Sequence, residues 1–343
     1  LFHKCTSLRK AKIGAFIGPK TTELYAMFSE CRSLTAVDFS GTDTSKVRYF
    51  DEMFKSCTSL RSFDFADLDT RSARTLSDFF AGCSSLRSVN LSKLKTAKVT
   101  DLTGMFEGCS ALTSLDLSRF KTKKVVRMSS MFSGCTSLRS LDLSSFRTPN
   151  VVSMSWAFGD CTSLRSLDLS TFNTPKLMYA DSLFKGCSAL RSVDLSNMDT
   201  TRVRENQEGV IPNMFDGCTS LAWVRVGKSF AILGSDMFPK ATSKKGWWSF
   251  ASKEWLSKKA IVSGRSRVPD IYLSKAAKGQ DLKNAKVSAS KMQYTGAAIK
   301  PAVKVVVGGK RLTQGIDFTA SFKNNKKVGT GKAIIRSEER RVG

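Results

Sequence analysis

The sequence predicts an α/β repeat fold, a solenoid of about nine strand–helix units followed by a truncated all-β module. Three observations predict this fold. Cysteine recurs at a constant interval of 26 residues, seven times in succession. A leucine stands three residues after each of the nine cysteines. Beyond residue 285 the pattern changes to short Val-rich or alternating segments separated by Gly and Asn pairs. A fixed period of this kind is the signature of stacked repeats.

Composition narrows the classes of function. The chain has 343 residues, more than one hydrophobic core usually needs, and its formal net charge is +26. A single histidine, His3, argues against Ser-His-Asp catalysis and against multi-histidine metal sites. No run of about 18 apolar residues is present, so we expect no membrane span within this sequence. We expect a non-enzymatic protein without a cofactor or a metal site.

The segment after each cysteine predicts a short strand. In the sixth unit, Leu138, Leu141 and Leu143 have the spacing L-x-x-L-x-L, and Phe146 follows at an apolar corner. This pattern resembles a leucine-rich repeat, whose period of about 20–29 residues includes the interval found here. Because side chains alternate along a strand, Asp142 should face outward.

The segment before each cysteine predicts a helix. Thr148-Pro149 and Thr174-Pro175 look like helix starts, with Thr as the N-cap and Pro at the first helical position. Five apolar residues after Thr122 have the spacing of one helix face: Val125, Met128, Met131, Phe132 and Cys135. Each unit is therefore predicted as strand, corner and helix, and stacked units would share one core.

The cysteine spacing also predicts the state of the thiols. No two cysteines stand two to four residues apart, as metal sites and redox pairs require. A corner at the end of each helix would hold neighbouring cysteines too far apart, or too parallel, to form a disulfide. We expect small buried core residues with free thiols: Cys5, Cys31, Cys57, Cys83, Cys109, Cys135, Cys161, Cys187 and Cys218.

Two columns of charged or polar residues on the outer side of the strands form the candidate ligand-binding site. In the pattern L-x-x-L-x-L, these positions line the concave sheet surface. One column contains Asp38, Asp64, Asn90, Asp116, Asp142, Asp168 and Asp194, and the other contains Arg61, Arg87, Arg139, Arg165 and Arg191. Carboxylates about 4.8 Å apart would repel, and arginines on the same strands could neutralise them. Three interpretations stay open: a self-paired polar ladder, a repetitive binding surface, and a Ca²⁺ column, for which one carboxylate per repeat is a poor cage.

The repeat unit closely resembles the 26-residue repeat of BspA-like bacterial surface proteins. The pattern M-F-x-G-C-T-S-L-R-S-L-D-L-S-x-F is clearest from Met131 onward, and the resemblance covers residues 1–238. It implies a leucine-rich solenoid displayed on the cell surface and used for adhesion, without a catalytic motif. Because Leu1-Phe2 already occupies the Met-Phe position before Cys5, we expect the natural chain to begin upstream.

Four segments are predicted along the chain: an N-terminally truncated solenoid over 1–234, a Trp-containing cap and linker over 235–275, a partial module over 276–335 and an artefact over 336–343. Trp247, Trp248 and Trp255 would cover the last repeat, and a carbohydrate-binding platform is the alternative. The module resembles the immunoglobulin-like modules of Gram-positive surface proteins. The last eight residues look like a translated sequencing-adapter oligonucleotide.

These features predict a bacterial cell-surface adhesin. Its partner would be a protein or glycan of a host or neighbouring cell, bound by polyvalent contact through the concave face. The alternative is a polyanion-binding protein, because residues 236–343 contain 24 Lys and Arg against 7 Asp and Glu. Under this alternative the polyanion would be nucleic acid or an anionic cell-wall polymer, and of the two we expect the cell-wall polymer. A third hypothesis is a catalytic domain beyond the ends of this sequence.

Overall fold

The structure is a computed structural model of the chain. It describes residues 1–203 and 213–231, together with strands at 247–249, 254–256, 270–273, 286–289, 303–307, 310–312, 318–323 and 332–337. The chain divides into two compact units, Leu1–Ser274 and Lys275–Gly343. Each unit is described by itself.

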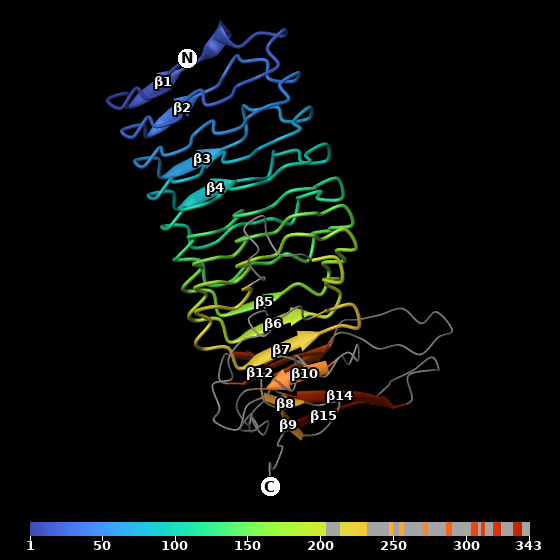
Figure 1. Ribbon diagram of the computed structural model, residues 1–343. Helices are drawn as coiled ribbons and strands as arrows, with labels where there is room; N and C mark the ends of the chain where they lie inside the picture. Colours follow the sequence, from blue (N-terminus) through green and yellow to red (C-terminus); the bar gives the residue numbers. More distant parts are fainter. Residues whose placement is uncertain are drawn as a thin grey trace. The chain divides into compact units, whose positions relative to one another are not determined.

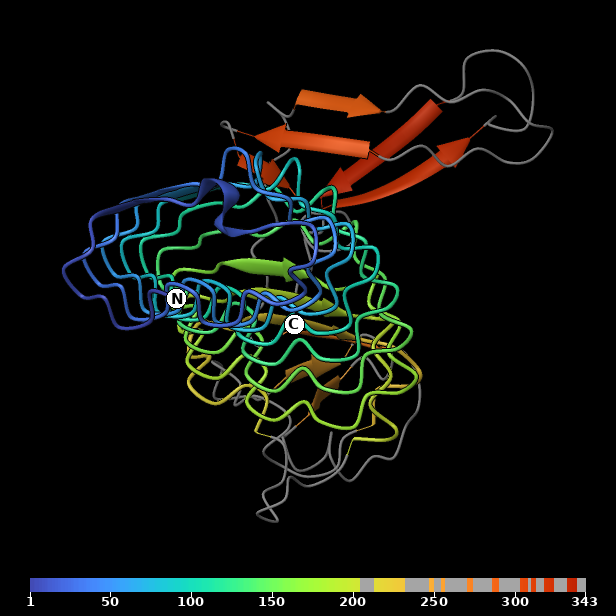
Figure 2. The same ribbon diagram turned by 90° about the horizontal axis from the view of Figure 1, so that it is seen from above.

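The first unit contains a single column of coils, which confirms the predicted repeat solenoid. We number the coils 1 to 9 by their cysteines, from Cys5 to Cys218. Each coil passes once around the core, and successive coils lie one above the other (Figures 1 and 2). In strands paired between coils 26 residues apart, each residue lies beside the residue one sequence period further on. Ser62 pairs with Ser88, and Ser166 pairs with Ser192.

One side of the column carries short parallel strands. They are β1 Lys10–Lys12, β2 Ala36–Asp38, β3 Ser62–Asp64, β4 Ser88–Asn90, β5 Ser166–Asp168, β6 Ser192–Leu195 and β7 Trp223–Val226. β1 pairs with β2, β3 with β4, and β6 with both β5 and β7. The strand expected around Asp142 in coil 6 is not formed, although Leu141 and Leu143 are buried and Asp142 is exposed as predicted.

The predicted helices are wrong. Within the described residues the only helical element is a single turn of 3₁₀ helix, η1 Gly14–Phe16. In coils 2 to 8, two positions in the segment before the cysteine have left-handed backbone: in coil 6, Ser130 has φ of 54° and Gly134 has φ of 70°. Such residues cannot lie inside a right-handed helix. The backbone bonds instead to the next coil, as in the bond from Phe132 N–H to the carbonyl of Ala157 (2.9 Å).

The misleading signal was the three-residue spacing of apolar side chains. Consecutive turns join Met131 N–H to the carbonyl of Met128 and Cys135 N–H to the carbonyl of Phe132. Each of these bonds spans three residues, so a series of tight turns directs about every third side chain into the core. One face of a helix places its side chains at nearly the same spacing. Periodicity alone does not separate the two structures.

The threonines expected as N-caps form a buried ladder instead. In coil 5, Thr122 is 2% exposed. Its hydroxyl donates to the carbonyl of Arg147 (2.9 Å) and accepts from the N–H of the same residue (2.7 Å), one coil further on. The same position is buried in coils 2 to 8: Thr44, Thr70, Thr96, Thr122, Thr148, Thr174 and Thr200. Each of these threonines bonds to the backbone of the following coil. The ladder therefore fixes the register between coils.

Two ladders of stacked phenylalanines fill the core. Phe106 stacks on Phe132 with a centroid distance of 5.9 Å, and on the other ladder Phe120 stacks on Phe146 at the same distance. The two ladders advance equally from coil to coil. The strands occupy the side of the column where the concave binding face was expected, and we call this side the strand face.

The cysteines form a third ladder, and all nine thiols are free. Eight of them donate a hydrogen bond to a phenylalanine carbonyl of the preceding coil, at 2.9–3.3 Å. Burial raises the pKa of the Cys83, Cys135 and Cys187 thiols to about 12. Cys5 is exposed and the other eight are buried. The buried thiols are therefore protonated at neutral pH and act as core residues.

Antiparallel strands follow β7 in the same sheet. They are β8 Trp247–Ser249, β9 Glu254–Leu256 and β10 Asp270–Leu273. The strand order β5-β6-β7-β10-β8-β9 places β10 against the edge of β7. β7 therefore has a hydrogen-bonded neighbour on each side, as a cap requires. The predicted boundaries of the cap, 235 and 275, stay predictions, since most of that segment lies outside the described residues.

The second unit contains antiparallel strands, as its short Val-rich and alternating segments predicted. β11 Lys286–Ala289, β12 Val303–Val307 and β13 Lys310–Leu312 form one sheet, and β14 Phe318–Lys323 pairs with β15 Lys332–Ser337. These pairings do not establish two packed sheets, so the immunoglobulin-like module stays a prediction. β15 runs through Arg336 and Ser337, so the strand does not break at 336 as expected. Residues 338–343 of the expected adapter artefact lie outside the described residues.

The threonine ladder can be tested in coil 5. Thr122→Val keeps the shape of the side chain but leaves the buried N–H and carbonyl of Arg147 without the hydroxyl. We expect a loss of about 1–3 kcal/mol in the free energy of unfolding, seen as a lower midpoint in guanidinium titration. Thr122→Ser keeps the hydroxyl and should lose less. Equal midpoints for the wild-type chain and Thr122→Val would contradict the ladder.

Thiol titration tests the cysteine ladder. In the native protein, Ellman's reagent should react rapidly with one thiol, Cys5, because the other eight are buried and protonated. In guanidinium without reductant, all nine should react. A native count of several fast thiols, or a denatured count well below nine, would show that the cysteines are arranged otherwise.

Candidate binding surfaces of the solenoid

The strand face carries both predicted columns. In coils 2 to 8 an aspartate or asparagine stands seven residues after the cysteine, and in coils 3, 4, 6, 7 and 8 the predicted arginine stands four residues after it. All five arginines of the predicted site are exposed, as are Asp64, Asn90, Asp116, Asp142 and Asp168, while Asp38 and Asp194 are half-buried. The structure therefore places the predicted site residues on one side of the column.

Each carboxylate of the aspartate column has a local structural role. One oxygen of Asp142 accepts the N–H of Ser144, two residues further on, at 2.9 Å. The same bond is present in coils 2 to 8, from Asp38, Asp64, Asn90, Asp116, Asp142, Asp168 and Asp194, at 2.8–3.1 Å. Such a bond closes a turn and holds the chain as it leaves the strand. Binding a ligand is therefore not needed to explain the column.

Repulsion between the carboxylates of this column is reduced by hydrogen bonds and by side chains of the next coil. Asn90 donates to the second oxygen of Asp64 (2.9 Å), and Arg225 lies 3.4 Å from Asp194. Hydrogen bonds from the backbone and side chain of Ser144 lower the pKa of Asp142. The side chain and backbone of Ser118 lower the pKa of Asp116 in the same way. These carboxylates are consequently ionised at neutral pH.

The arginines of the predicted site lie outside ion-pair distance of the aspartates. Among the ion pairs of the described residues, none involves the arginines of the predicted site: Arg61, Arg87, Arg139, Arg165 and Arg191. Their backbones bond from coil to coil, as from Arg191 N–H to the carbonyl of Arg165 (2.8 Å). The guanidinium groups therefore remain available to carboxylates of a partner, which they can bind through two hydrogen bonds each.

A second column of parallel bridges, which the sequence analysis missed, lies eight residues before each cysteine of coils 2 to 8. It links Glu23, Tyr49, Thr75, Asp101, Arg127, Ser153 and Tyr179. Within this column Arg127 bonds to Asp101 at 2.7 Å, while Thr75 and Ser153 bond to side chains next to the column. Burial raises the pKa of Asp51, although its hydrogen bond from Thr75 acts in the opposite direction. This side is polar and largely self-satisfied, and only the constant period could have indicated it.

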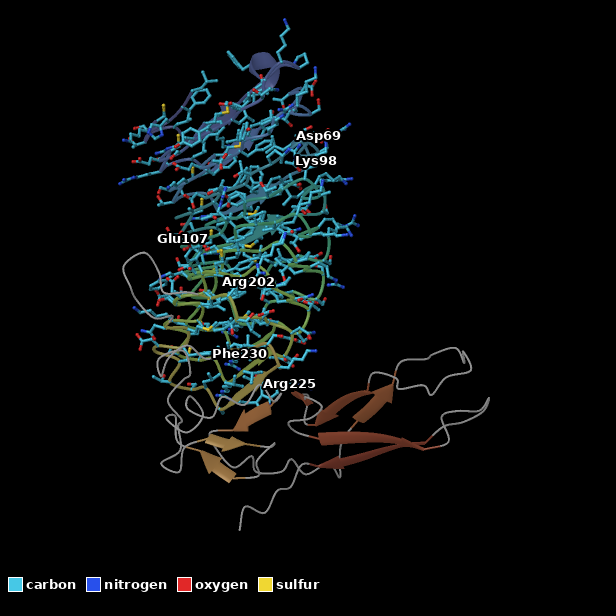
Figure 3. All side chains as sticks on the ribbon, turned by 45° about the vertical axis from the view of Figure 1, so that its right-hand side comes forward. Asp69, Lys98, Glu107, Arg202, Arg225 and Phe230 are labelled. Carbon is cyan, nitrogen blue, oxygen red and sulfur yellow. The ribbon has the colours of Figure 1, made fainter. Side chains whose placement is uncertain are left out.

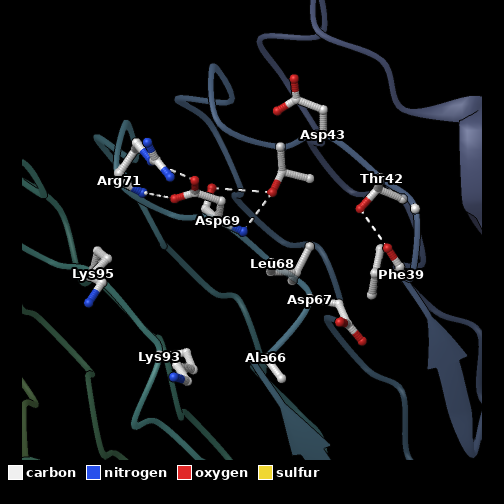
Figure 4. A pocket seen from close by; sticks show the side chains of 12 residues that line it. Phe39, Thr42, Asp43, Ala66, Asp67, Leu68, Asp69, Arg71, Lys93 and Lys95 are labelled. Atoms are coloured by element: carbon white, nitrogen blue, oxygen red, sulfur yellow. Dashed lines mark hydrogen bonds and ion pairs between the residues drawn. The ribbon is translucent and has the colours of Figure 1, made fainter.

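The corners after the strands form a third surface. Asp69 and Lys98 lie at this edge of the column, with Glu107 at the opposite edge (Figure 3). A shallow pocket of about 450 Å³ lies on the corners of coils 2 to 4. Asp43, Asp67 and Asp69 line one part of it, and Lys93 and Lys95 line another (Figure 4). The sequence analysis did not identify this pocket, because its residues belong to three different repeats.

Within the described residues, no group of three His, Cys, Asp or Glu side chains is placed to hold a metal ion. In the same part of the chain, no helix has the length and apolar character of a membrane span.

Comparison with known proteins gives a family and a few distant likenesses. A family model described as "Mycoplasma protein of unknown function, DUF285" matches residues 1–88, 61–166 and 103–222. No curated protein matches the chain.

Two solved bacterial structures are similar. The first, a leucine rich cell surface protein from Faecalibacterium prausnitzii A2-165, is 17% identical, with a TM-score of 0.26, over 66% of this chain and 74% of its own. The second, a leucine-rich repeat protein from Bacteroides ovatus ATCC 8483, is 19% identical, with a TM-score of 0.31, over 67% of this chain and 63% of its own. At these TM-scores, the solenoid assignment rests on the coil register of this chain alone.

The aspartate column can be tested in coil 6. Asp142→Ala removes the acceptor of the Ser144 N–H and should lower the free energy of unfolding by roughly 0.5–1.5 kcal/mol. Asp142→Asn should retain most of the stability, because Asn90 makes the same bond to Ser92 in coil 4. Midpoints of guanidinium titration at pH 7 measure both variants. Equal midpoints for the alanine and asparagine variants would contradict the turn-closing role.

The pH dependence has a defined sign. The pKa of Asp142 is lowered from 3.8 in the folded chain. The ionised carboxylate therefore contributes its full stabilisation of the folded chain above pH 3.8. This stabilisation is lost as the pH falls through the lower folded pKa. Asp142→Asn should therefore show a weaker loss of stability than the wild-type chain when the pH is lowered below 4. An identical acid profile would contradict this assignment.

Proposed function

Since the chain belongs to the family described as Mycoplasma protein of unknown function, DUF285, we propose that it is a non-enzymatic bacterial surface protein that binds partners through its strand face. The resemblance of its repeat to BspA-like surface proteins supports display on the cell surface and adhesion. The ligand class is a protein or glycan of a host or neighbouring cell.

The observation that carries this proposal is the column of exposed arginines without an ion pair. A guanidinium group presents a planar set of donors that matches a carboxylate, and it is less strongly hydrated than an ammonium group. Arg139, Arg165 and Arg191 repeat at one-coil intervals, and the backbone bonds between coils hold them in register. An acidic segment of a partner could therefore contact several arginines at once.

The aspartate column adds selectivity to this surface. It runs parallel to the arginines, three residues further along each coil, so positive and negative columns lie side by side. A uniformly acidic partner would be repelled by the aspartates, whereas one with both signs of charge would be accepted. Each contact is weak, and repetition along the column raises the effective concentration of the next contact.

A second candidate function is polyanion binding by the C-terminal part. Residues 236–343 contain 24 basic and 7 acidic side chains. A segment with this excess attracts anionic polymers, and the attraction weakens steeply with salt. Arginine–carboxylate contacts distributed over a shape-matched face should weaken less.

Adhesion of coated beads tests the strand face. Beads carrying the full chain are added to fixed epithelial cells in 150 mM salt. The triple variant Arg139→Gln, Arg165→Gln, Arg191→Gln should reduce the number of bound beads at least tenfold, because three contacts of roughly 0.5–1 kcal/mol each are lost.

The matched control removes three exposed cations elsewhere on the solenoid, by Lys46→Gln, Arg48→Gln and Arg74→Gln. Its adhesion should stay near that of the wild-type chain. Equal losses in both variants, or adhesion that disappears from all proteins at moderate salt, would instead support binding by the basic C-terminal part.

A further inference from the structure

The corners of the solenoid differ in charge from coil to coil. We define a corner as the seven residues that begin nine residues after the cysteine. The corners of coils 2 and 3, residues 40–46 and 66–72, contain three aspartates and two basic side chains. Those of coils 4 to 6, residues 92–98, 118–124 and 144–150, contain no acidic residue. Their eight basic residues are all exposed, and we call them the corner patch: Lys93, Lys95, Lys98, Arg119, Lys121, Lys123, Lys124 and Arg147.

The backbone under the corner patch is rigid. The N–H groups of Lys95, Lys121 and Arg147 donate to the buried threonines of the preceding coils, at 2.7–2.8 Å. Stacking of Phe120 on Phe146 at 5.9 Å holds the corners of coils 5 and 6 together from below. A ligand therefore meets basic residues on a fixed backbone, and binding must order only side chains.

The cations of the corner patch form no ion pairs with the described acidic residues. No ion pair among the described residues includes any of the eight. The guanidinium of Arg147 bonds to the carbonyls of Ser144 and Phe146. The charge of Arg119 acts on Asp116, whose carboxylate already accepts the N–H of Ser118. Eight cations on three adjacent corners repel one another, and a polyanion that displaces their counterions relieves this repulsion.

We propose that the corner patch binds a sulfated linear polysaccharide. The ligand must be a polyanion, because the patch offers cations over three successive coils. Its repeating unit should carry more than one anionic group, because coil 4 contributes three cations and coil 5 contributes four. Six of the eight are lysines, which act as compact point charges toward sulfate oxygens.

The absence of exposed aromatic rings in the patch favours a sulfated polysaccharide over single-stranded nucleic acid. Proteins that bind single strands stack bases on exposed aromatic side chains. The aromatic residues of these corners, Phe120 and Phe146, are buried. The large exposed apolar residues of the described chain, which include Tyr25 and Tyr49, belong to coils 1 to 3. The patch is also separate from the strand-face arginines, so this proposal does not depend on the proposed function.

Calorimetric titration of the full chain with heparin oligosaccharides of defined length tests the proposal. The variant Lys93→Gln, Lys95→Gln, Lys121→Gln, Lys123→Gln should reduce affinity at least tenfold and should reduce the slope of log affinity against log salt. The matched control Arg61→Gln, Arg87→Gln, Arg139→Gln, Arg165→Gln removes the same charge from the strand face and should change affinity less than twofold. Replacement of the same four lysines by arginine should retain binding.

Three outcomes would overturn the proposal. One is unchanged affinity in the lysine-to-glutamine variant, which would assign heparin binding to other basic segments. Another is an equal loss in the strand-face control, which would indicate an effect of net charge alone. The third is patch-dependent binding of oligothymidylate, or of desulfated heparin, as tight as that of heparin. The number of thiols that react in the native protein shows whether each variant keeps its fold. If the fourfold lysine variant unfolds, the single variants Lys95→Gln and Lys121→Gln are measured instead, and the same outcomes apply to them.

Discussion

The solenoid depends on one constraint, the register of 26 residues between hydrogen-bonded coils. Hydrogen bonds of backbone groups, thiols and hydroxyls all join successive coils in this register. Cys135 donates to the carbonyl of Phe106 in the coil before, and Thr122 donates to the carbonyl of Arg147 in the coil after. No coil satisfies its own buried polar groups, so each coil is stable only between its neighbours. A shift by one residue would leave the buried hydroxyl and thiol of every coil unpaired and would turn the apolar columns outward.

The sequence predicted the features that repeat with this register and misjudged the local backbone between them. Burial of Leu141, Leu143 and Phe146 followed from periodicity, and so did the outward direction of Asp142. The helices failed because tight turns and helices place apolar side chains at similar spacing. The left-handed positions that decide between them are occupied in different coils by residues as different as Trp156 and Ser182, so composition gave no warning.

The candidate site was predicted in position and only partly in role. An aspartate at a strand end can face a ligand or accept the N–H two residues further on, and the sequence does not distinguish these uses. In this chain it does the second, which leaves the arginines without the partners expected for them. The corner surfaces were missed for another reason. Their residues are far apart in sequence and vary between coils, so alignment on a repeat consensus treats them as noise.

That variation is itself informative, because the repeats are an internal comparison of what the fold requires. Within one corner, the threonine is buried and constant through coils 2 to 8. The residue before it changes from Asp69 to Lys121 to Asn173, and in each case its carbonyl accepts the threonine hydroxyl of the preceding coil. The fold therefore accepts either charge, or none, at this exposed position. A run of cations in coils 4 to 6 is not needed for stacking and even opposes it by repulsion. We therefore infer binding to a partner from the charges at exposed positions that coil stacking does not constrain.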